Sequence, residues 1–227
     1  MSPRAVAFSR TAVLHAAVAV VRRRGLKGLS ARAVAAALRS SVAPVYGAYR
    51  SMGELTRGVL EDARARLDER TRRAFTDIPF LNIGVGIVEF ARDEPRLFQA
   101  LFLSRHHQRD ILEKFRDSVL SRMKADAVLR LMPDHSLERV LDRIWLYTLG
   151  LATAIVYDQM PDTRTDAIIG SLKDMGNVLM LAELAGTADS DSPTNDAQWT
   201  RLMREAGIVL PPGKPGACPA PDREEST

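Results

Sequence analysis

Two short apolar stretches separated by three residues limit the fold of this chain more than any other part of its sequence. The stretches cover residues 31–38 and 42–49, and Arg39-Ser40-Ser41 connects them. In the second stretch, Val45 and Tyr49 are spaced to share one helical face. A helix of about eight residues is only ~12 Å long, so it buries too little apolar surface to be stable alone. The sequence therefore predicts two short helices packed on neighbours, joined by the short connection of a helix-turn-helix.

The rest of the chain is also predicted to be helical, because strand-like alternation is scarce and Ala, Leu and Arg dominate. Ser30, Ser41 and Ser51 are expected N-caps, and glycines and prolines mark further boundaries. The predicted fold class is all-α. The helices expected from these boundaries cover residues 9–24, 30–38, 42–49, 52–75, 79–92, 94–104, 107–131, 136–159 and 163–185.

Composition excludes several classes of protein. The single cysteine, Cys218, rules out an internal disulfide and a cysteine-rich zinc site, which fits a reducing cytosol. No apolar run approaches the ~20 residues that a membrane span needs. We also find no Ser/His/Asp spacing, phosphate loop or metal-ligand set. The sequence thus predicts a cytoplasmic protein that is not an enzyme and has no cofactor, metal or membrane partner.

Charge is distributed unevenly. Residues 1–60 contain ten Lys and Arg but one acid, a net charge of +9, although the whole chain carries only +4. A basic end on a mildly acidic body predicts a polyanion partner for that end. A solvated basic face is the alternative.

The outward face of residues 42–49 is suited to DNA because its side chains are small. Small groups let a helix lie deep in the major groove and touch thymine methyls. The Tyr46 hydroxyl can reach a phosphate, helix N-termini at Ser30 and Ser41 offer amide hydrogens, and arginines can neutralise phosphates. The expected DNA-binding residues are Ser30, Arg32, Ser41, Val42, Ala43, Pro44, Tyr46, Gly47 and Arg50.

The segment from about Arg10 to Val59 resembles the DNA-binding domain of tetracycline-repressor (TetR) family transcriptional regulators. The matching residues are Gly25 after "VLHAAVAVVRRR", "AVA" at 33–35, Ser41, Pro44-Val45-Tyr46, Tyr49, Ser51 and Glu54-Leu55. The resemblance implies that the third helix enters the major groove, that Tyr46 contacts phosphate, and that the start of the second helix contacts the DNA backbone.

Arg39-Ser40, Ala48 and Met52 depart from the family pattern, Ala48 at the second position of its usual aromatic pair. Arg39-Ser40 stands where the family usually has Gly-Val, and an arginine in a left-handed turn costs about 1 kcal/mol. Met52 stands where the family often has a phosphate-contacting lysine. These departures keep an alternative open, in which the chain is a helical sensor or interaction protein with degenerate DNA binding.

The C-terminal helices carry more apolar surface than a small monomer core needs. The helix predicted over 163–185 has two apolar stripes, and small residues recur at Gly150, Ala154, Gly170 and Gly176. We therefore expect a homodimer through the helices at 136–159 and 163–185. Two copies would also place two short helices on successive half-sites of DNA.

The resemblance continues more weakly in "IWLYTLGLA" and "DEPRLFQALF", and implies a small-molecule pocket in the body. Candidate lining residues are Phe98, Phe102, Met123, Trp145, Tyr147 and Tyr157. Aromatic and Met side chains at helical spacing are also ordinary core residues.

The sequence as a whole favours a ligand-responsive, sequence-specific transcriptional regulator, a repressor released from its operator by a small molecule. Residues 1–51 are the predicted helix-turn-helix DNA-binding domain, and residues 52–186 the ligand-binding and dimerisation domain. The long helix that begins at Met52 would join the two and act as the lever. Residues 187–227 are rich in Pro, Gly, Ser and Asp, which predicts a mostly disordered tail.

Overall fold

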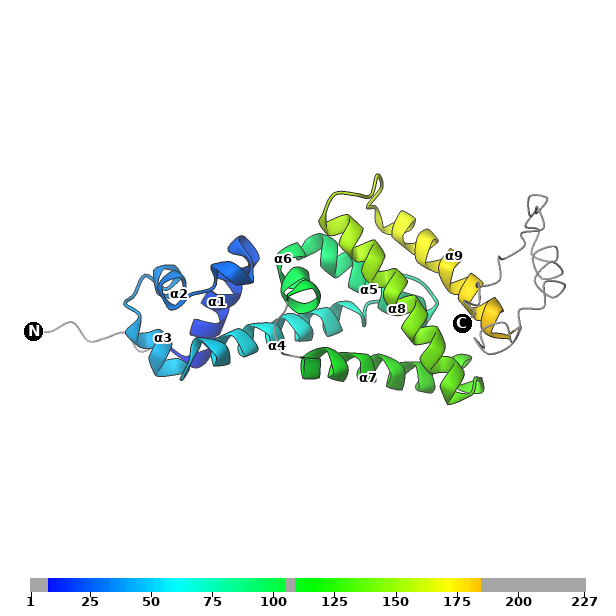
Figure 1. The fold of residues 1–227 in the computed structure, drawn as a ribbon, viewed down its shortest axis with the longest axis horizontal. Helices are drawn as coiled ribbons and strands as arrows, with labels where there is room; N and C mark the ends of the chain where they lie inside the picture. The colour runs from blue at the N-terminus through cyan, green and yellow to red at the C-terminus, as the bar shows by residue number, and fades with distance from the viewer. Residues whose placement is uncertain (1–7, 105–108, 185–227) are drawn as a thin grey trace, which may run out of the picture. The chain divides into compact units, whose positions relative to one another are not determined.

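The computed structural model describes residues 8–104 and 109–184, and the predicted tail at 187–227 lies outside them. The regular elements in these two ranges are helical, which confirms the all-α prediction (Figure 1). Described residues up to Glu183 belong to one compact unit. None of the helices in the described ranges is long and apolar enough to cross a membrane. The helices are α1 (Arg10–Arg24), η1 (Leu26–Gly28), α2 (Ala31–Ala37), α3 (Ala43–Ala48), α4 (Met52–Arg70), α5 (Pro79–Asp93), α6 (Pro95–Phe98), η2 (Gln99–Leu103), α7 (Arg109–Ala125), η3 (Leu129–Leu131), α8 (Asp134–Val156) and α9 (Thr165–Leu184).

Serine side chains set the starts of two of the predicted helices. The Ser30 hydroxyl accepts a hydrogen bond from the Ala33 amide at 3.2 Å, and Ser51 accepts from the Glu54 amide at 3.1 Å. These bonds confirm both residues as N-caps. The same expectation for Ser41 is wrong, because the N-cap of α3 is Val42, whose backbone is already in the right-handed helical region.

Two predicted helices are shorter than expected. The fourth ends at Arg70 rather than residue 75. Thr71 is its C-cap, which packs against α5 at Gly86 and accepts two hydrogen bonds from Arg122 of α7. The helix predicted over 107–131 breaks at Ala125. There the Asp126 carboxylate accepts from the amides of Val128 and Leu129 at 2.9 and 3.0 Å, and such local bonding competes with the helix. The predicted helix at 94–104 is one turn of α6 followed by the π-helical turn η2.

The first three helices form a small head, the name used below for α1–α3. One face of α1 supplies most of its core, and α2 adds Val34 and Ala35. Between its two ends α3 buries only Val45, and Tyr49 follows directly after it. The head therefore depends on contacts of α1 with both short helices, as the sequence predicts.

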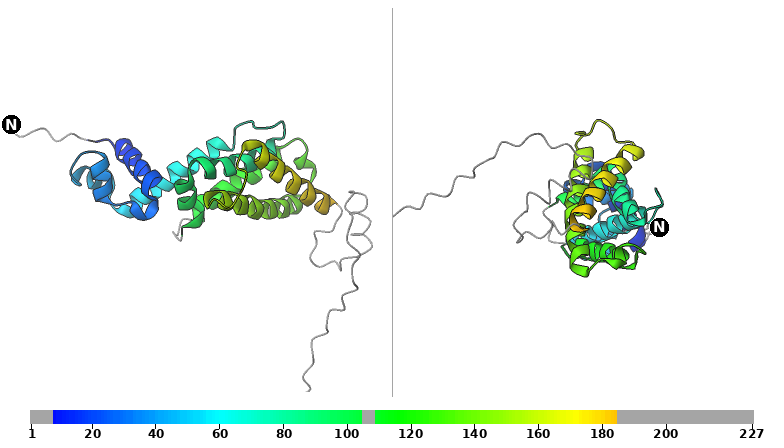
Figure 2. Two further views of the ribbon diagram at one scale, coloured as in Figure 1. Left: turned by 90° about the horizontal axis from the view of Figure 1, so that it is seen from above. Right: turned by 90° about the vertical axis from the view of Figure 1, so that its right-hand side faces the viewer.

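The long helix α4 leads from the head to the body, which consists of α5–α9 (Figures 1 and 2). Its apolar side is buried along its length, and it contacts α1 at one end and α5 and α7 further along. Gly58 faces the head, where an added Cβ would lie 3.4 Å from Leu14 and 3.6 Å from Tyr49. One continuous helix thus contributes to both cores.

Within the body, α5 is buried on nearly every side and packs mainly against α8. An aromatic cluster lies beside it. Ring centroids are 4.9 Å apart for Phe98 and Phe102, 6.1 Å for Phe102 and Trp145, and 5.8 Å for Phe115 and Trp145. These contacts join the short α6–η2 segment to α7 and α8.

The turn between α2 and α3 contains Arg39 in the left-handed region, with φ of 52°. The conformation that the sequence predicts for this position is confirmed. An L side chain there costs about 1 kcal/mol, which a glycine would avoid.

We expect Arg39→Gly to raise the free energy of unfolding by about 0.5–1 kcal/mol, because relief of strain exceeds the extra entropy of glycine in the unfolded chain. Urea denaturation of the full chain measures it. Arg39→Ala is the matched control, since it removes the charge but keeps the Cβ, and it should give no gain. Equal stability of the two variants would contradict strain at this turn.

Candidate functional site

The third helix has a buried face and an exposed face. Val45 and Tyr49 are 1% and 3% exposed, so both belong to the core of the head. Tyr46 is 54% exposed, and Val42, Ala43 and Gly47 are exposed with it, while Pro44 is half-buried. The outward face therefore consists of small side chains, and the phenol of Tyr46 projects from it.

The start of α2 offers a second group of hydrogen-bond donors. The Ser30 hydroxyl satisfies the Ala33 amide, while the first-turn amides of Ala31 and Arg32 have no helical acceptor by their position. Such amides, at the positive end of a helix, are suited to phosphate. Ser41 is exposed in the turn before α3 and does not cap that helix.

Arginines near α3 fall into two groups. Arg32, Arg39 and Arg50 are exposed, and none of their guanidinium groups lies within 4 Å of a carboxylate among residues 8–104 and 109–184. Arg10 instead pairs with Glu54 at 2.8 Å, and Arg57 pairs with Asp110 at 2.5 Å. The first group is available to a polyanion, whereas the second is already paired with carboxylates.

Arg10 fixes the position of α3 through three contacts. Its Nη1 donates to the Ala48 carbonyl at 2.8 Å, at the end of α3. Its Nη2 reaches Glu54 at the start of α4, and its guanidinium lies 4.0 Å from the centre of the Tyr49 ring. Glu54 also accepts from the Arg50 amide at 2.7 Å. We call Arg10, Tyr49 and Glu54 the clamp, because they tie α1, α3 and α4 together.

The clamp changes the acid–base properties of its members. The hydrogen bond from Arg10, helped by the Arg50 amide, lowers the pKa of Glu54 below its ordinary value. Burial raises the pKa of the Tyr49 hydroxyl. Glu54 therefore stays ionised, and its bonds to Arg10 and the Arg50 amide persist, to a lower pH than for an unpaired glutamate.

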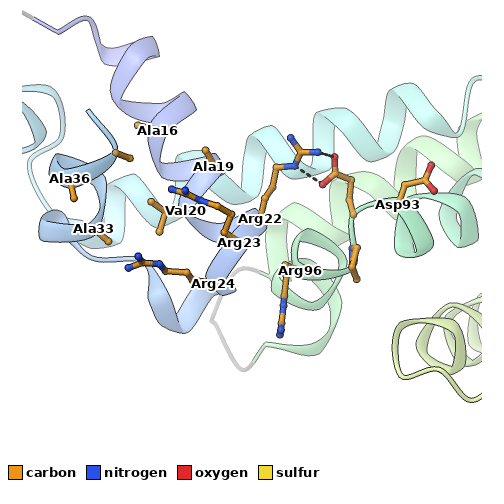
Figure 3. A pocket seen from close by; sticks show the side chains of 13 residues that line it. Ala16, Ala19, Val20, Arg22, Arg23, Arg24, Ala33, Ala36, Asp93 and Arg96 are labelled. Atoms are coloured by element: carbon orange, nitrogen blue, oxygen red, sulfur yellow. Dashed lines mark hydrogen bonds and ion pairs between the residues drawn. The ribbon is translucent and has the colours of Figure 1, made fainter. Parts of the chain in front are cut away.

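A polar recess of about 860 Å³ lies between the head and the start of α6. Arg22 crosses it and binds both carboxylate oxygens of Glu94, at 2.6 and 2.7 Å; dashed lines at Arg22 in Figure 3 mark this pair. Figure 3 shows Arg24 and Arg96 extending in different directions, so these arginines do not converge on one point. The recess therefore holds a link between head and body rather than a focused anion site.

The body contains an apolar cavity of about 740 Å³ lined by α5, α7, α8, α9 and the segments that precede α5 and follow α7. Its walls are mainly aliphatic side chains. Its volume lies in the range of small-molecule sites. Residues that line it include Phe80, Ile83, Ile87, Val119, Arg122, Leu141, Ile144, Trp145, Thr148, Leu172, Gly176 and Met180.

Only Trp145 among the six sequence-predicted pocket residues lines this cavity. Phe98 and Met123 are buried in the core, and Phe102 packs between Phe98 and Trp145. The Tyr147 hydroxyl is 2.6 Å from that of Ser171, and Tyr157 is 55% exposed. Sequence reasoning selected aromatic residues, whereas the wall is built of aliphatic residues from four helices that no local spacing brings together.

Residues of the described ranges do not gather three or more His, Cys, Asp or Glu side chains that could hold a metal ion.

Comparison with solved structures places this arrangement of helices among known folds. A TetR-like transcriptional regulator from Rhodococcus sp. RHA1 superposes with a TM-score of 0.56, at 21% identity over 82% of this chain and 100% of that one. A TetR-family transcriptional regulator from Streptomyces coelicolor gives 0.62, at 17% identity over 87% and 97%. The chain has the TetR-like fold. Neither a scan against protein-family models nor a search of curated proteins gives a match.

We expect the stabilisation by Glu54 to depend on pH. A carboxyl whose pKa is lowered by folding stabilises the protein above its unfolded pKa of about 4.3, and this contribution disappears as pH falls through the lower folded value. Urea denaturation across this range should show wild type more stable than Glu54→Gln near neutrality and the difference shrinking in acid. Glu113→Gln, at an exposed glutamate of α7, controls for the loss of one charge. A difference that does not vary with pH would contradict the role of the ionised clamp.

Proposed function

We propose that this protein is a sequence-specific DNA-binding transcriptional regulator that acts as a homodimer and responds to a small molecule, a repressor in the cytoplasm that the ligand releases from its operator. The observation that carries the proposal is the outward face of α3. It combines small side chains with the exposed phenol of Tyr46, and exposed arginines lie before and after it.

Each part of this face suits one component of duplex DNA. Ala43 and Gly47 allow the backbone of α3 close to the base edges of a major groove, where Val42 and Ala43 can meet thymine methyls. Tyr46 and the first-turn amides of α2 can donate to phosphates, which fixes the register without reading sequence. Arg32 and Arg50 add salt-dependent affinity.

The dimer is proposed to form through an exposed apolar stripe on α8 and its neighbour on α9. On α8, Leu146 is 72% exposed and shares a face with Gly150 and Tyr157. On α9, Val178 and Leu181 are each about half exposed. A Cβ added at Gly150 would meet open space among the described residues, which leaves room for a second helix. Gly176, in contrast, lines the cavity.

Control by a ligand is proposed to run through α4. The cavity touches α5 and α7, and both of these helices contact α4. A ligand that binds better to a state with a different position of α4 would move the two heads relative to the half-sites. Affinity for DNA would fall by linkage.

The direct test is titration of the full chain, at two salt concentrations, against duplex from upstream of its own gene, with unrelated duplex of equal length as competitor. We expect nanomolar binding that survives the competitor. Tyr46→Phe should weaken binding to every duplex by a similar factor and leave the unfolding curve unchanged. Ser121→Ala removes an exposed hydroxyl from α7, which lies on neither the outward face of α3 nor the proposed dimer stripe, and is the control.

Weak binding that is steeply salt-dependent and shows no preference for sequence would contradict the proposal. The chain would then fit the alternative, a TetR-like sensor or interaction protein with degenerate DNA binding. Equal affinity of wild type and Tyr46→Phe would remove Tyr46 from the contacts while leaving sequence-specific binding in place.

We further expect Leu146→Glu to convert the dimer to monomer in sedimentation experiments, because a charge would be buried in the apolar interface. Operator binding should weaken in parallel. Leu131→Glu is the control, since Leu131 is 78% exposed but lies outside α8 and α9. A Leu146→Glu variant that sediments like wild type would move the interface elsewhere.

A further inference from the structure

The cavity in the body has one charged group in an unusual position. Arg122, on α7, lines the otherwise apolar wall and is half-buried. Among the residues that the structure describes, no carboxylate lies within 4 Å of its guanidinium. The nearby Asp68 is paired with Arg72 at 3.0 Å. Burial, together with the charge of Arg72, lowers the pKa of Arg122, and Asp68 offsets this only in part.

Arg122 instead binds the end of α4. Its Nη1 donates to the Thr71 hydroxyl at 3.0 Å, and its Nη2 donates to the Thr71 carbonyl at 2.7 Å. Thr71 is fully buried and is the C-cap of α4. It also packs tightly on α5, since a Cβ added at Gly86 would lie 2.7 Å from the Thr71 Cα. One arginine therefore touches both the cavity and the last residue of the helix that carries the head.

The other charged residues that line the cavity are engaged or exposed. Asp126 accepts from the amides of Val128 and Leu129, and Asp77 and Lys173 are exposed. Ile78 and Val128 also line the cavity while being 42% and 69% exposed, so its opening is apolar. Among the charged residues that line the cavity, Arg122 is thus the cation placed to bind a group of a molecule inside it.

We propose that the cavity binds an apolar molecule with one anionic end group, a carboxylate or a group of similar shape, and that Arg122 holds this end group in place of Thr71. A carboxylate presents two oxygens to the same two N–H groups that now bind Thr71. Bonds to an ionised acceptor are stronger than bonds to a neutral hydroxyl and carbonyl, and this difference favours the exchange. The end of α4 would then lose both bonds from α7. The consequence for DNA rests on the proposed function, but the binding step does not.

Sodium decanoate and 1-decanol are suitable probes, because they share an apolar chain and differ in the charge of one end. Calorimetric titration of the full chain should show decanoate binding more tightly, by about tenfold or more, the typical effect of a charge-assisted hydrogen bond. Arg122→Met should abolish the preference while 1-decanol still binds, which shows that the cavity is intact. Lys124→Met, which removes an exposed cation from the same helix, should keep the preference.

Equal affinities of the two probes for wild type, binding of neither probe, or an unchanged preference in Arg122→Met would each overturn the proposal. If the methionine variant does not fold, Arg122→Lys decides the matter. It keeps the charge but not the two-pronged geometry, and a preference as large as that of wild type would overturn the role of the guanidinium.

The effect on DNA is measured separately. Decanoate should lower the affinity of wild type for its operator duplex, and should leave that of Arg122→Met unchanged. Failure of the unliganded chain to bind DNA would contradict the proposed function but not the anion preference. A wild-type complex with DNA that decanoate does not weaken, despite binding in the cavity, would overturn the exchange at Thr71.

Discussion

A helix of six residues cannot hold its own position, and this constraint determines how the N-terminal part of the molecule is built. Because α3 buries only Val45 within its own length, its orientation must come from outside. Tyr49 anchors its end in the core, and Arg10 bonds its last carbonyl and stacks on the same tyrosine. The outward face can then consist of small residues, because it contributes nothing to holding the helix in place.

The same constraint makes α4 the helix on which the position of the head depends. Glu54, in its first turn, completes the clamp, and Thr71, directly after its last turn, is held by Arg122. Between them a continuous buried face packs first on the head and then on the body. Exposed ion pairs such as Arg57 with Asp110 add little to stability. The position of the head is therefore set by apolar packing along α4 and by the contacts at its two ends.

Sequence reasoning succeeded where the signals are local. The caps at Ser30 and Ser51, the spacing of Val45 and Tyr49, and the left-handed turn at Arg39 each depend on residues close together in the sequence, so the three-helix head follows from them. The cap expected at Ser41 was wrong. It failed where the deciding contacts lie far apart in the chain. The end of α4 depends on α5 and α7, and the cavity on aliphatic residues of four helices. Arg122 gave no sequence signal, since one arginine in an amphipathic helix is ordinary.

The positive charge available near α3 is smaller than the composition of the first sixty residues indicates. The first sixty residues carry a net charge of +9, but Arg10, Arg22 and Arg57 are paired with carboxylates. Two of these carboxylates, Glu94 and Asp110, belong to the body. The cations left beside α3 include Arg39, which stands in a strained turn. A glycine there would relieve about 1 kcal/mol of strain but remove one of the positive charges nearest the outward face. A glycine at residue 39 would therefore favour stability, whereas the arginine present there favours attraction of a polyanion.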